Sequence, residues 1–199
     1  MKKIAIAVHG GAGPDSDFIK QHEEEYKKAL EHAVNMGYHM LEKGENALDV
    51  VEKVVNYFED NPLFNAGKGS AITNLGKVEM CASIMDGKDL ASGAVATVYN
   101  VKNPISLARV VLDHTEHVYI SQDGALALAK EAGLPLEPDL YFHTLHQVET
   151  WLKKREEEME DGKPKIKEGT PVNFNKKKTS PTFHPAIRMS LCMIIKICD

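Results

Sequence analysis

The sequence has few cysteines, no long apolar run and no complete nucleotide-binding motif, and each absence argues against a class of protein. Its three cysteines, Cys81, Cys192 and Cys198, are an odd number without CxxC spacing, so neither a disulfide framework nor a zinc site is indicated. No apolar run approaches the roughly 20 residues that a helix needs to cross a bilayer. The glycine-rich turn His9–Pro14 lacks the full spacing of a dinucleotide-binding motif or a P-loop. We therefore expect neither membrane insertion nor nucleotide binding.

The main part of the chain also lacks an excess of basic residues. The net charge is −5, but eight basic and two acidic residues lie from Lys163 onward, so the part before it carries −11 and the tail +6. Binding to nucleic acid needs clustered Lys and Arg against phosphates, and we expect no such partner. Met1-Lys2-Lys3 precedes only a short apolar run without a small-residue cleavage site. Together with the unpaired cysteines, this favours a cytoplasmic location.

The apolar pattern predicts an α/β protein. Residues 4–8 are apolar at almost every position, which is typical of a central strand covered on both faces. Residues 161–178 are rich in Lys, Gly and Pro, which indicates a flexible linker, and residues 179–199 change character again. Further strands are predicted over 78–85, 93–99 and 118–120, and helices over 17–43, 46–59, 103–112, 121–133 and 141–159.

A glycine-bearing loop at Asn61–Ser70 precedes the predicted strand pair. Gly67 and Gly69 flank Lys68, so the backbone there can take a positive φ or pass close to another group. Such a loop is suited to wrapping something small. Turn sequences on either side of residues 78–85 predict a strand meander rather than a helix pair.

This loop carries a resemblance to a known family. Phe64-Asn65-Ala66-Gly67-x-Gly69, followed by Met85-Asp86-Gly87, resembles the isoaspartyl peptidases and plant-type L-asparaginases, which are threonine hydrolases of the N-terminal-nucleophile superfamily. His9-Gly10-Gly11-Ala12-Gly13 and Asn103-Pro104-Ile105 agree with it. The resemblance covers about residues 3–160 and fits this branch better than glycosylasparaginase. It implies hydrolysis of the asparagine side-chain amide and of β-aspartyl dipeptides, without a cofactor for catalysis.

The resemblance also implies the fold and the domain organisation. The family forms an αββα sandwich, of which this chain would supply a partial one, with the second half of the fold missing. We expect residues 1–160 to be the first-subunit (alpha) portion, 161–178 a linker and 179–199 an unmatched tail. A missing beta subunit would complete the sheets, and pairs of alpha and beta units would form a homo-oligomer. Without that partner, exposed strand edges favour association of the chain with itself.

The nucleophile implied by the resemblance is a threonine that self-cleavage frees at a sequence similar to Gly-Thr-Val-Gly. That motif is absent from these 199 residues. Thr170 and Thr179 are poor substitutes, because Pro171 restricts Thr170 and no glycine precedes Thr179. We expect this chain alone to be inactive. The alternative is a non-catalytic pseudoenzyme, a partner subunit or the product of a damaged coding sequence.

The resemblance assigns two further features to the glycine-bearing loop. Asn65 would lie beside the nucleophilic threonine, although an asparagine here can equally be a turn residue that bonds nearby backbone. Backbone carbonyls would hold a structural sodium ion, because a hard cation prefers oxygen ligands, and a metal-free turn is the alternative. The implied sodium ligands are the carbonyls of Phe58, Glu59, Asn61, Phe64, Ala66 and Lys68. His9 is either catalytic or hydrogen-bonded at the strand end, and we expect the second role.

Overall fold

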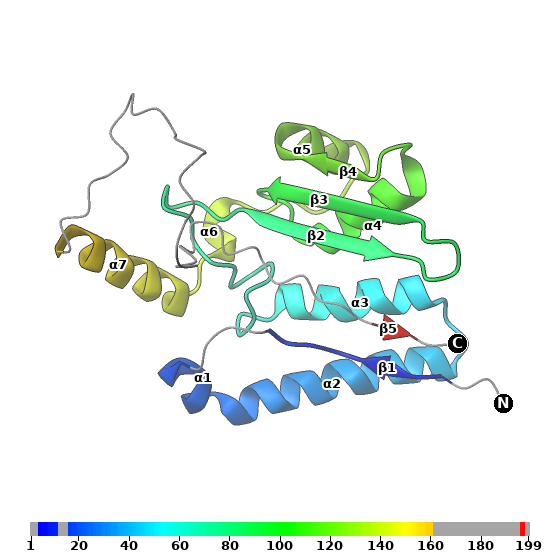
Figure 1. Ribbon diagram of the computed structural model, residues 1–199, viewed down its shortest axis with the longest axis horizontal. Helices are drawn as coiled ribbons and strands as arrows, with labels where there is room; N and C mark the ends of the chain where they lie inside the picture. Colours follow the sequence, from blue (N-terminus) through cyan, green and yellow to red (C-terminus); the bar gives the residue numbers. More distant parts are fainter. Residues whose placement is uncertain (1–3, 12–15, 161–195, 198–199) are drawn as a thin grey trace, which may run out of the picture.

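A computed structural model describes residues 4–11, 16–160 and 196–197, and these form a mixed α/β fold (Figure 1). In that part of the chain, no helix is long and apolar enough to cross a membrane. The strands are β1 (Ile6–Ala7), β2 (Met80–Met85), β3 (Ser92–Val98), β4 (Tyr119–Ser121) and β5 (Lys196–Ile197). The helices are α1 (Asp17–Gln21), α2 (Glu23–Glu42), α3 (Ala47–Asp60), α4 (Pro104–His114), α5 (Gln122–Glu131), α6 (Asp139–Phe142) and α7 (Leu145–Glu160).

The larger sheet has the strand order β2-β3-β4. β2 and β3 pair antiparallel, as the turn sequences predict, and β4 joins β3 in parallel after the crossover through α4. Ile84 lies opposite Gly93, on the face that α4 covers. A Cβ at Gly93 would lie 2.2 Å from the Ala108 carbonyl oxygen, so a glycine lets α4 approach the sheet closely.

Helices α2 and α3 lie side by side, with α3 next to this sheet and α2 beyond it (Figure 1). α3 begins where the sequence predicts, because the Asn46 side-chain oxygen accepts a 2.8 Å hydrogen bond from the Leu48 amide. Its apolar stripe, including Val50, Val54 and Phe58, is fully buried. A Cβ at Gly37 of α2 would lie within 3 Å of Ile6 and Val54, so this glycine permits three elements to meet.

The prediction of a central strand at residues 4–8 is wrong for the described structure. β1 covers only Ile6–Ala7 and pairs with β5 in a two-stranded sheet. Ile4, Ile6 and Val8 pack against the core, whereas Ala5 and Ala7 are exposed. Alanines fit a covered or an exposed face equally, so the continuous apolar run does not specify two covered faces. The strand is covered on one face.

Two predicted helices are each divided by a histidine. The helix predicted over 17–43 breaks at His22, whose φ and ψ of −110° and 18° leave the helical range. Its Nδ1 donates to the Phe18 carbonyl oxygen at 2.8 Å, so the side chain bonds the helix backbone in the preceding turn. The helix predicted over 141–159 begins earlier, as α6, and breaks at His143, whose Nε2 pairs with Asp139 at 2.9 Å.

The predicted linker at 161–178 lies outside the described residues, as do Cys192 and Cys198. The unmatched tail is described only at β5. The domain boundaries therefore remain predictions.

Candidate functional site

The candidate site is built on residues 61–71, which we call the glycine loop. Its two glycines have positive φ angles, +50° at Gly67 and +109° at Gly69, as the loop sequence predicts. A Cβ at Gly67 would lie 2.2 Å from the Glu59 carbonyl oxygen, and one at Gly69 would lie 2.7 Å from the carbonyl oxygens of Pro62 and Phe64. The Lys68 amide donates to the Glu59 carbonyl at 2.7 Å and closes the loop on the end of α3. Any side chain at these two positions would push the backbone apart.

Aromatic side chains fix the first half of the loop to the core. Phe64 is 1% exposed and makes edge contacts with the rings of Phe58 and Tyr26. The Tyr26 hydroxyl also donates to the Leu63 carbonyl oxygen at 2.5 Å. The position of the loop is therefore set by helices α2 and α3.

Asn65 lies within the loop, and its Oδ1 accepts a 2.7 Å hydrogen bond from the Ala71 amide. This bond closes the loop across six residues, which is the backbone-bonding role that an asparagine in a turn can have. It uses the side-chain oxygen. The side-chain NH₂ group is the part of Asn65 that can donate to a substrate or to a nucleophile.

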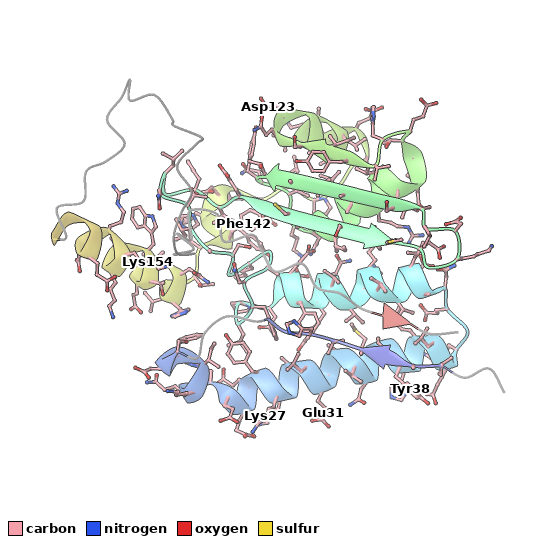
Figure 2. The ribbon with its side chains drawn as sticks, in the orientation of Figure 1. Lys27, Glu31, Tyr38, Asp123, Phe142 and Lys154 are labelled. Carbon is pink, nitrogen blue, oxygen red and sulfur yellow. The ribbon has the colours of Figure 1, made fainter. Side chains whose placement is uncertain are left out.

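The second half of the loop is held from α6 and α7, a support that the sequence did not reveal. The Gly69 amide donates to the Phe142 carbonyl at 3.0 Å, and the Gln147 side chain donates to the Gly69 carbonyl at 2.8 Å. Phe142 itself is fully buried and points inward from α6 (Figure 2). The Trp151 indole donates to the Thr73 carbonyl at 2.9 Å. The spacing of Gln147 and Trp151 marks one helix face, but nothing in the sequence identifies its partner 78 residues earlier.

Glu59 is a buried carboxyl group at the junction of the loop with α3 and α4. It is 3% exposed, its Oε1 accepts from the Ile105 amide at 2.9 Å, and its Oε2 has no hydrogen-bond partner among the described residues. Burial raises the pKa of the Glu59 carboxyl to about 8, although the Ile105 amide and the Asn103 side chain favour the charged form. The family resemblance assigns this residue a backbone role only. The sequence pattern that could have indicated a buried carboxyl group is a glutamate at the end of an otherwise apolar helical stripe.

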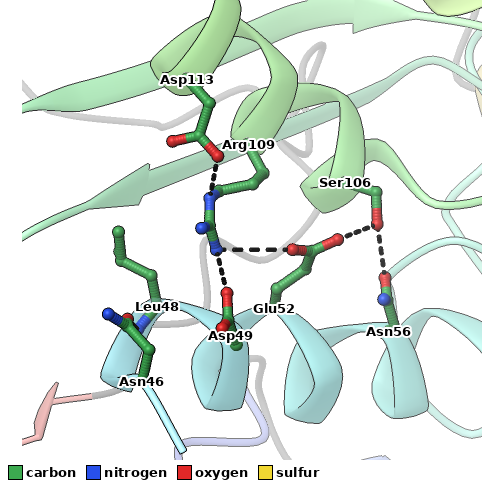
Figure 3. Close-up of polar contacts among 8 residues, drawn as sticks. All are labelled: Asn46, Leu48, Asp49, Glu52, Asn56, Ser106, Arg109 and Asp113. Carbon is green, nitrogen blue, oxygen red and sulfur yellow. Dashed lines mark hydrogen bonds and ion pairs between the residues drawn. The ribbon is translucent and has the colours of Figure 1, made fainter. Parts of the chain in front are cut away.

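Polar side chains also join α3 to α4 beside this junction (Figure 3). Arg109 on α4 contacts Asp49 at 2.8 Å and Glu52 at 3.7 Å on α3, and Asp113 on its own helix at 2.6 Å. The Ser106 hydroxyl donates to Glu52 at 2.7 Å. Because Arg109 and Ser106 share Glu52 on α3, these contacts fix the position of α4 relative to α3.

The carbonyl groups implied as sodium ligands belong to the last turn of α3 and to the glycine loop. The carbonyls of Phe58, Glu59 and Asn61 already accept bonds from backbone amides, and each keeps a second lone pair. The Phe64 carbonyl and its neighbour at Pro62 point toward the same position at Gly69. This donor set, all neutral oxygens in a tight loop, fits a hard monovalent cation. The described residues contain no cluster of three His, Cys, Asp or Glu side chains that would suit another metal.

The remaining candidates are His9, after β1, and two threonines outside the described residues. His9 is exposed, and its Nδ1 accepts a 3.3 Å bond from the Gly11 amide, which agrees with a structural role at the strand end. Thr170 and Thr179 lie outside the described residues. Asn65 thus lies in the same loop as Phe64, Ala66 and Lys68, while the sodium site and the two threonines remain predictions.

The family is established by comparison with known proteins. The profile of the asparaginase family matches residues 2–182, and this chain belongs to that family.

Its relatives include a probable isoaspartyl peptidase/L-asparaginase 2 of Arabidopsis thaliana, 47% identical over 140 residues, which are 70% of this chain and 43% of the relative. The isoaspartyl peptidase/L-asparaginase of Xenopus laevis is 41% identical over 78% of this chain and 49% of its own. The plant-type L-asparaginase of Pyrococcus horikoshii is 46% identical over 78% of this chain and 49% of its own. The chain thus spans about half the length of these relatives or less.

Proposed function

We propose that this chain is the first-subunit portion of an isoaspartyl peptidase/L-asparaginase, which hydrolyses asparagine and β-aspartyl dipeptides only when completed by a second subunit. The observation that carries this proposal is the match of residues 2–182 to the asparaginase family, with relatives so named that extend to about twice the matched length. The fold would then be one part of an αββα sandwich, and cleavage of a precursor would supply the nucleophilic threonine. Complete units would assemble as homo-oligomers.

The contribution of this chain to the site is the glycine loop with Asn65. The Ala71 amide occupies the side-chain oxygen of Asn65 and so fixes the direction of its NH₂ group. A donor held in this way can orient the threonine or stabilise charge in the transition state without reorganising. The carbonyl groups of the loop would hold a sodium ion that stiffens the turn and takes no part in the chemistry.

The test joins residues 1–160 to the unmatched half of the Pyrococcus horikoshii relative and measures ammonia release from asparagine and cleavage of a β-aspartyl dipeptide. We expect activity from the fusion and none from the chain alone. A fusion that folds and remains inactive would contradict the proposed function.

Two substitutions at Asn65 in that fusion separate its two roles. Asn65→Asp keeps an oxygen for the Ala71 amide and removes the NH₂ donor, whereas Asn65→Ala removes both. If the donor acts in the site, Asn65→Asp lowers kcat by about 10²-fold or more, the scale of losing one positioned donor, with thermal stability retained. Full activity of Asn65→Asp would mean that this side chain only holds the loop.

The second candidate is a non-catalytic partner subunit, favoured by the absence of Gly-Thr-Val-Gly from these 199 residues. The coding DNA through and beyond Lys178, translated in all three frames, separates the two. A Gly-Thr-Val-Gly sequence there supports the hydrolase, and its absence supports the non-catalytic protein. Activity of the chain alone that Thr170→Ala abolishes would overturn both.

A further inference from the structure

Helix α7 contacts the rest of the protein through hydrogen-bond donors on one face. Gln147, Trp151 and Arg155 recur every four residues, so they lie in one row along the helix. Each donates to a backbone carbonyl of one short segment, namely those of Gly69 at 2.8 Å, Thr73 at 2.9 Å and Asn74 at 3.3 Å.

The segment that receives these bonds, residues 69–76, is held at its start by the Phe142 carbonyl and the Asn65 side chain, whereas its later part has few contacts within the segment. Its regular pairing is a single bridge between Ile72 and Val78, and a bond joins the Thr73 amide to the Lys77 carbonyl at 2.8 Å. Leu75 is 84% exposed. The Trp151 ring lies 3.6 Å from the Cβ position of Gly76 and covers that turn. The order of the later part of this segment, residues 73–76, therefore depends on α7.

α7 is in turn held by few apolar contacts. None of its side chains that the structure describes is fully buried: Trp151 is half-buried, and the leucines Leu145 and Leu152 are 75% and 48% exposed. Its first turn rests on α1, where the ring of His146 stacks on Phe18 with centroids 3.6 Å apart. Elements with little buried apolar surface open at low free energy, well before the core. α7 is such an element, and Figure 1 shows it at the side of the molecule away from α3 and α4.

We propose that α7 is a latch, which docks and releases as a unit and which, within residues 69–76, sets the order of residues 73–76 and supports the Gly69 end of the glycine loop. The docked state satisfies three backbone carbonyls of that segment with side-chain donors. Release exposes them to water without disturbing the buried contacts of α3 and α4. This inference concerns the motion of the described chain and is independent of the proposed hydrolase activity.

The test is amide hydrogen exchange, followed by mass spectrometry, on the full chain at one pH. Trp151→Phe keeps a ring but removes the indole N–H, and Gln147→Met keeps the side-chain length but removes the amide donor. Lys153→Gln changes an exposed residue of the same helix and serves as the matched control. Peptides from α4 report the stability of the core in every sample.

The double variant Trp151→Phe and Gln147→Met is expected to exchange several-fold faster in peptides covering residues 69–76 and 145–157. Exchange in α4 should stay unchanged, and Lys153→Gln should match the unaltered chain. Unchanged exchange at 69–76 would overturn the latch. Equal acceleration in α4 would also overturn it, because α7 would then open only together with the core.

Discussion

The Glu59 side chain accepts a 2.9 Å hydrogen bond from the Ile105 amide, so the last turn of α3 caps the first turn of α4. Asn103, at the N-cap position of α4, makes no capping bond itself, and its side chain donates instead to Asp60 at 3.3 Å. The main chain of the same Glu59 closes the glycine loop through Lys68. One residue thereby joins the loop, α3 and α4, and its substitution affects all three.

Stability should depend on pH through Glu59. Because the folded-state pKa is raised from 4.5 to about 8, the unfolded chain ionises this group between these values while the folded chain keeps it protonated. The free energy of unfolding then falls as pH rises through this window, by up to about 1.4 kcal/mol per pH unit, and levels off above about 8.

Glu59→Gln keeps an acceptor for the Ile105 amide and cannot ionise, so it should remove this slope. Urea unfolding between pH 5 and 9 measures it, with the exposed Glu31→Gln on α2 as the control. A slope in Glu59→Gln equal to that of the unaltered chain would show that other groups cause the pH dependence.

Gly67→Ala should destabilise the protein much more than Gly133→Ala. Both glycines have left-handed φ angles, +50° and +67°, so each substitution carries a similar conformational cost of about 1–2 kcal/mol. Only at Gly67 would the new Cβ meet a backbone atom, the Glu59 carbonyl oxygen, whereas the space at Gly133 is open. Chemical denaturation of the two variants measures the difference. Equal losses would mean that the loop relaxes freely around the methyl group.

Sodium should stabilise the glycine loop. Replacing sodium with a large organic cation at constant ionic strength is expected to lower the thermal unfolding temperature, because the larger ion cannot enter a ring of carbonyl groups. Gly69→Ala, which displaces the Pro62 and Phe64 carbonyls, should unfold at a lower temperature that no longer depends on the cation. The same unfolding temperature for the unaltered chain in both salts would favour a turn that needs no metal.

Acid should weaken the docking of α7. Burial, with repulsion from His22, lowers the pKa of His146, and this outweighs the opposite influence of Glu149. The stacked state therefore favours neutral His146, and its stability is present above about pH 6.5 and is lost as pH falls below it. The charged residues of α1, the helix on which His146 stacks, are Asp17 and Lys20, and these are well exposed and pair with each other.

Amide exchange of residues 69–76, corrected for the intrinsic rate, should be faster at pH 5.5 than at pH 7.5 relative to α4. His146→Phe keeps the stack and should remove this difference. Equal or slower exchange at pH 5.5 in the unaltered chain would mean that attraction between the charged imidazole and the Phe18 ring outweighs its desolvation.

The sequence predicted the features of this fold that depend on local chemistry. The start of α3 near Asn46, the pairing of β2 with β3 and the positive φ angles of the loop glycines all follow from single residues and their neighbours. The breaks at His22 and His143 were missed because each depends on a side chain bonding four residues earlier, which competes with helix propensity only in the folded geometry.

Contacts between distant segments account for what the sequence could not show about the site. Asn65 and the carbonyl groups could be named from the resemblance, but the buried carboxyl group of Glu59 finds its partner 46 residues later, at Ile105. Gln147 and Trp151 likewise reach back across 78 residues, to Gly69 in the loop and to Thr73 just after it. The spacing of residues in the sequence indicates which donors share a helical face, but it does not indicate which carbonyl groups they bond.

The most direct test of the account is to mix this chain with a separately produced second half of the Pyrococcus horikoshii relative, and to follow mass by light scattering together with ammonia release. We expect the chain alone to associate with itself, since Met85 and Tyr119 on one face of the larger sheet are more than half exposed. We also expect it to be inactive, because it lacks the nucleophilic threonine. The mixture should form a defined complex of both halves that releases ammonia from asparagine. A chain that remains a monodisperse monomer, unfolds cooperatively by itself and ignores the second half would contradict the account.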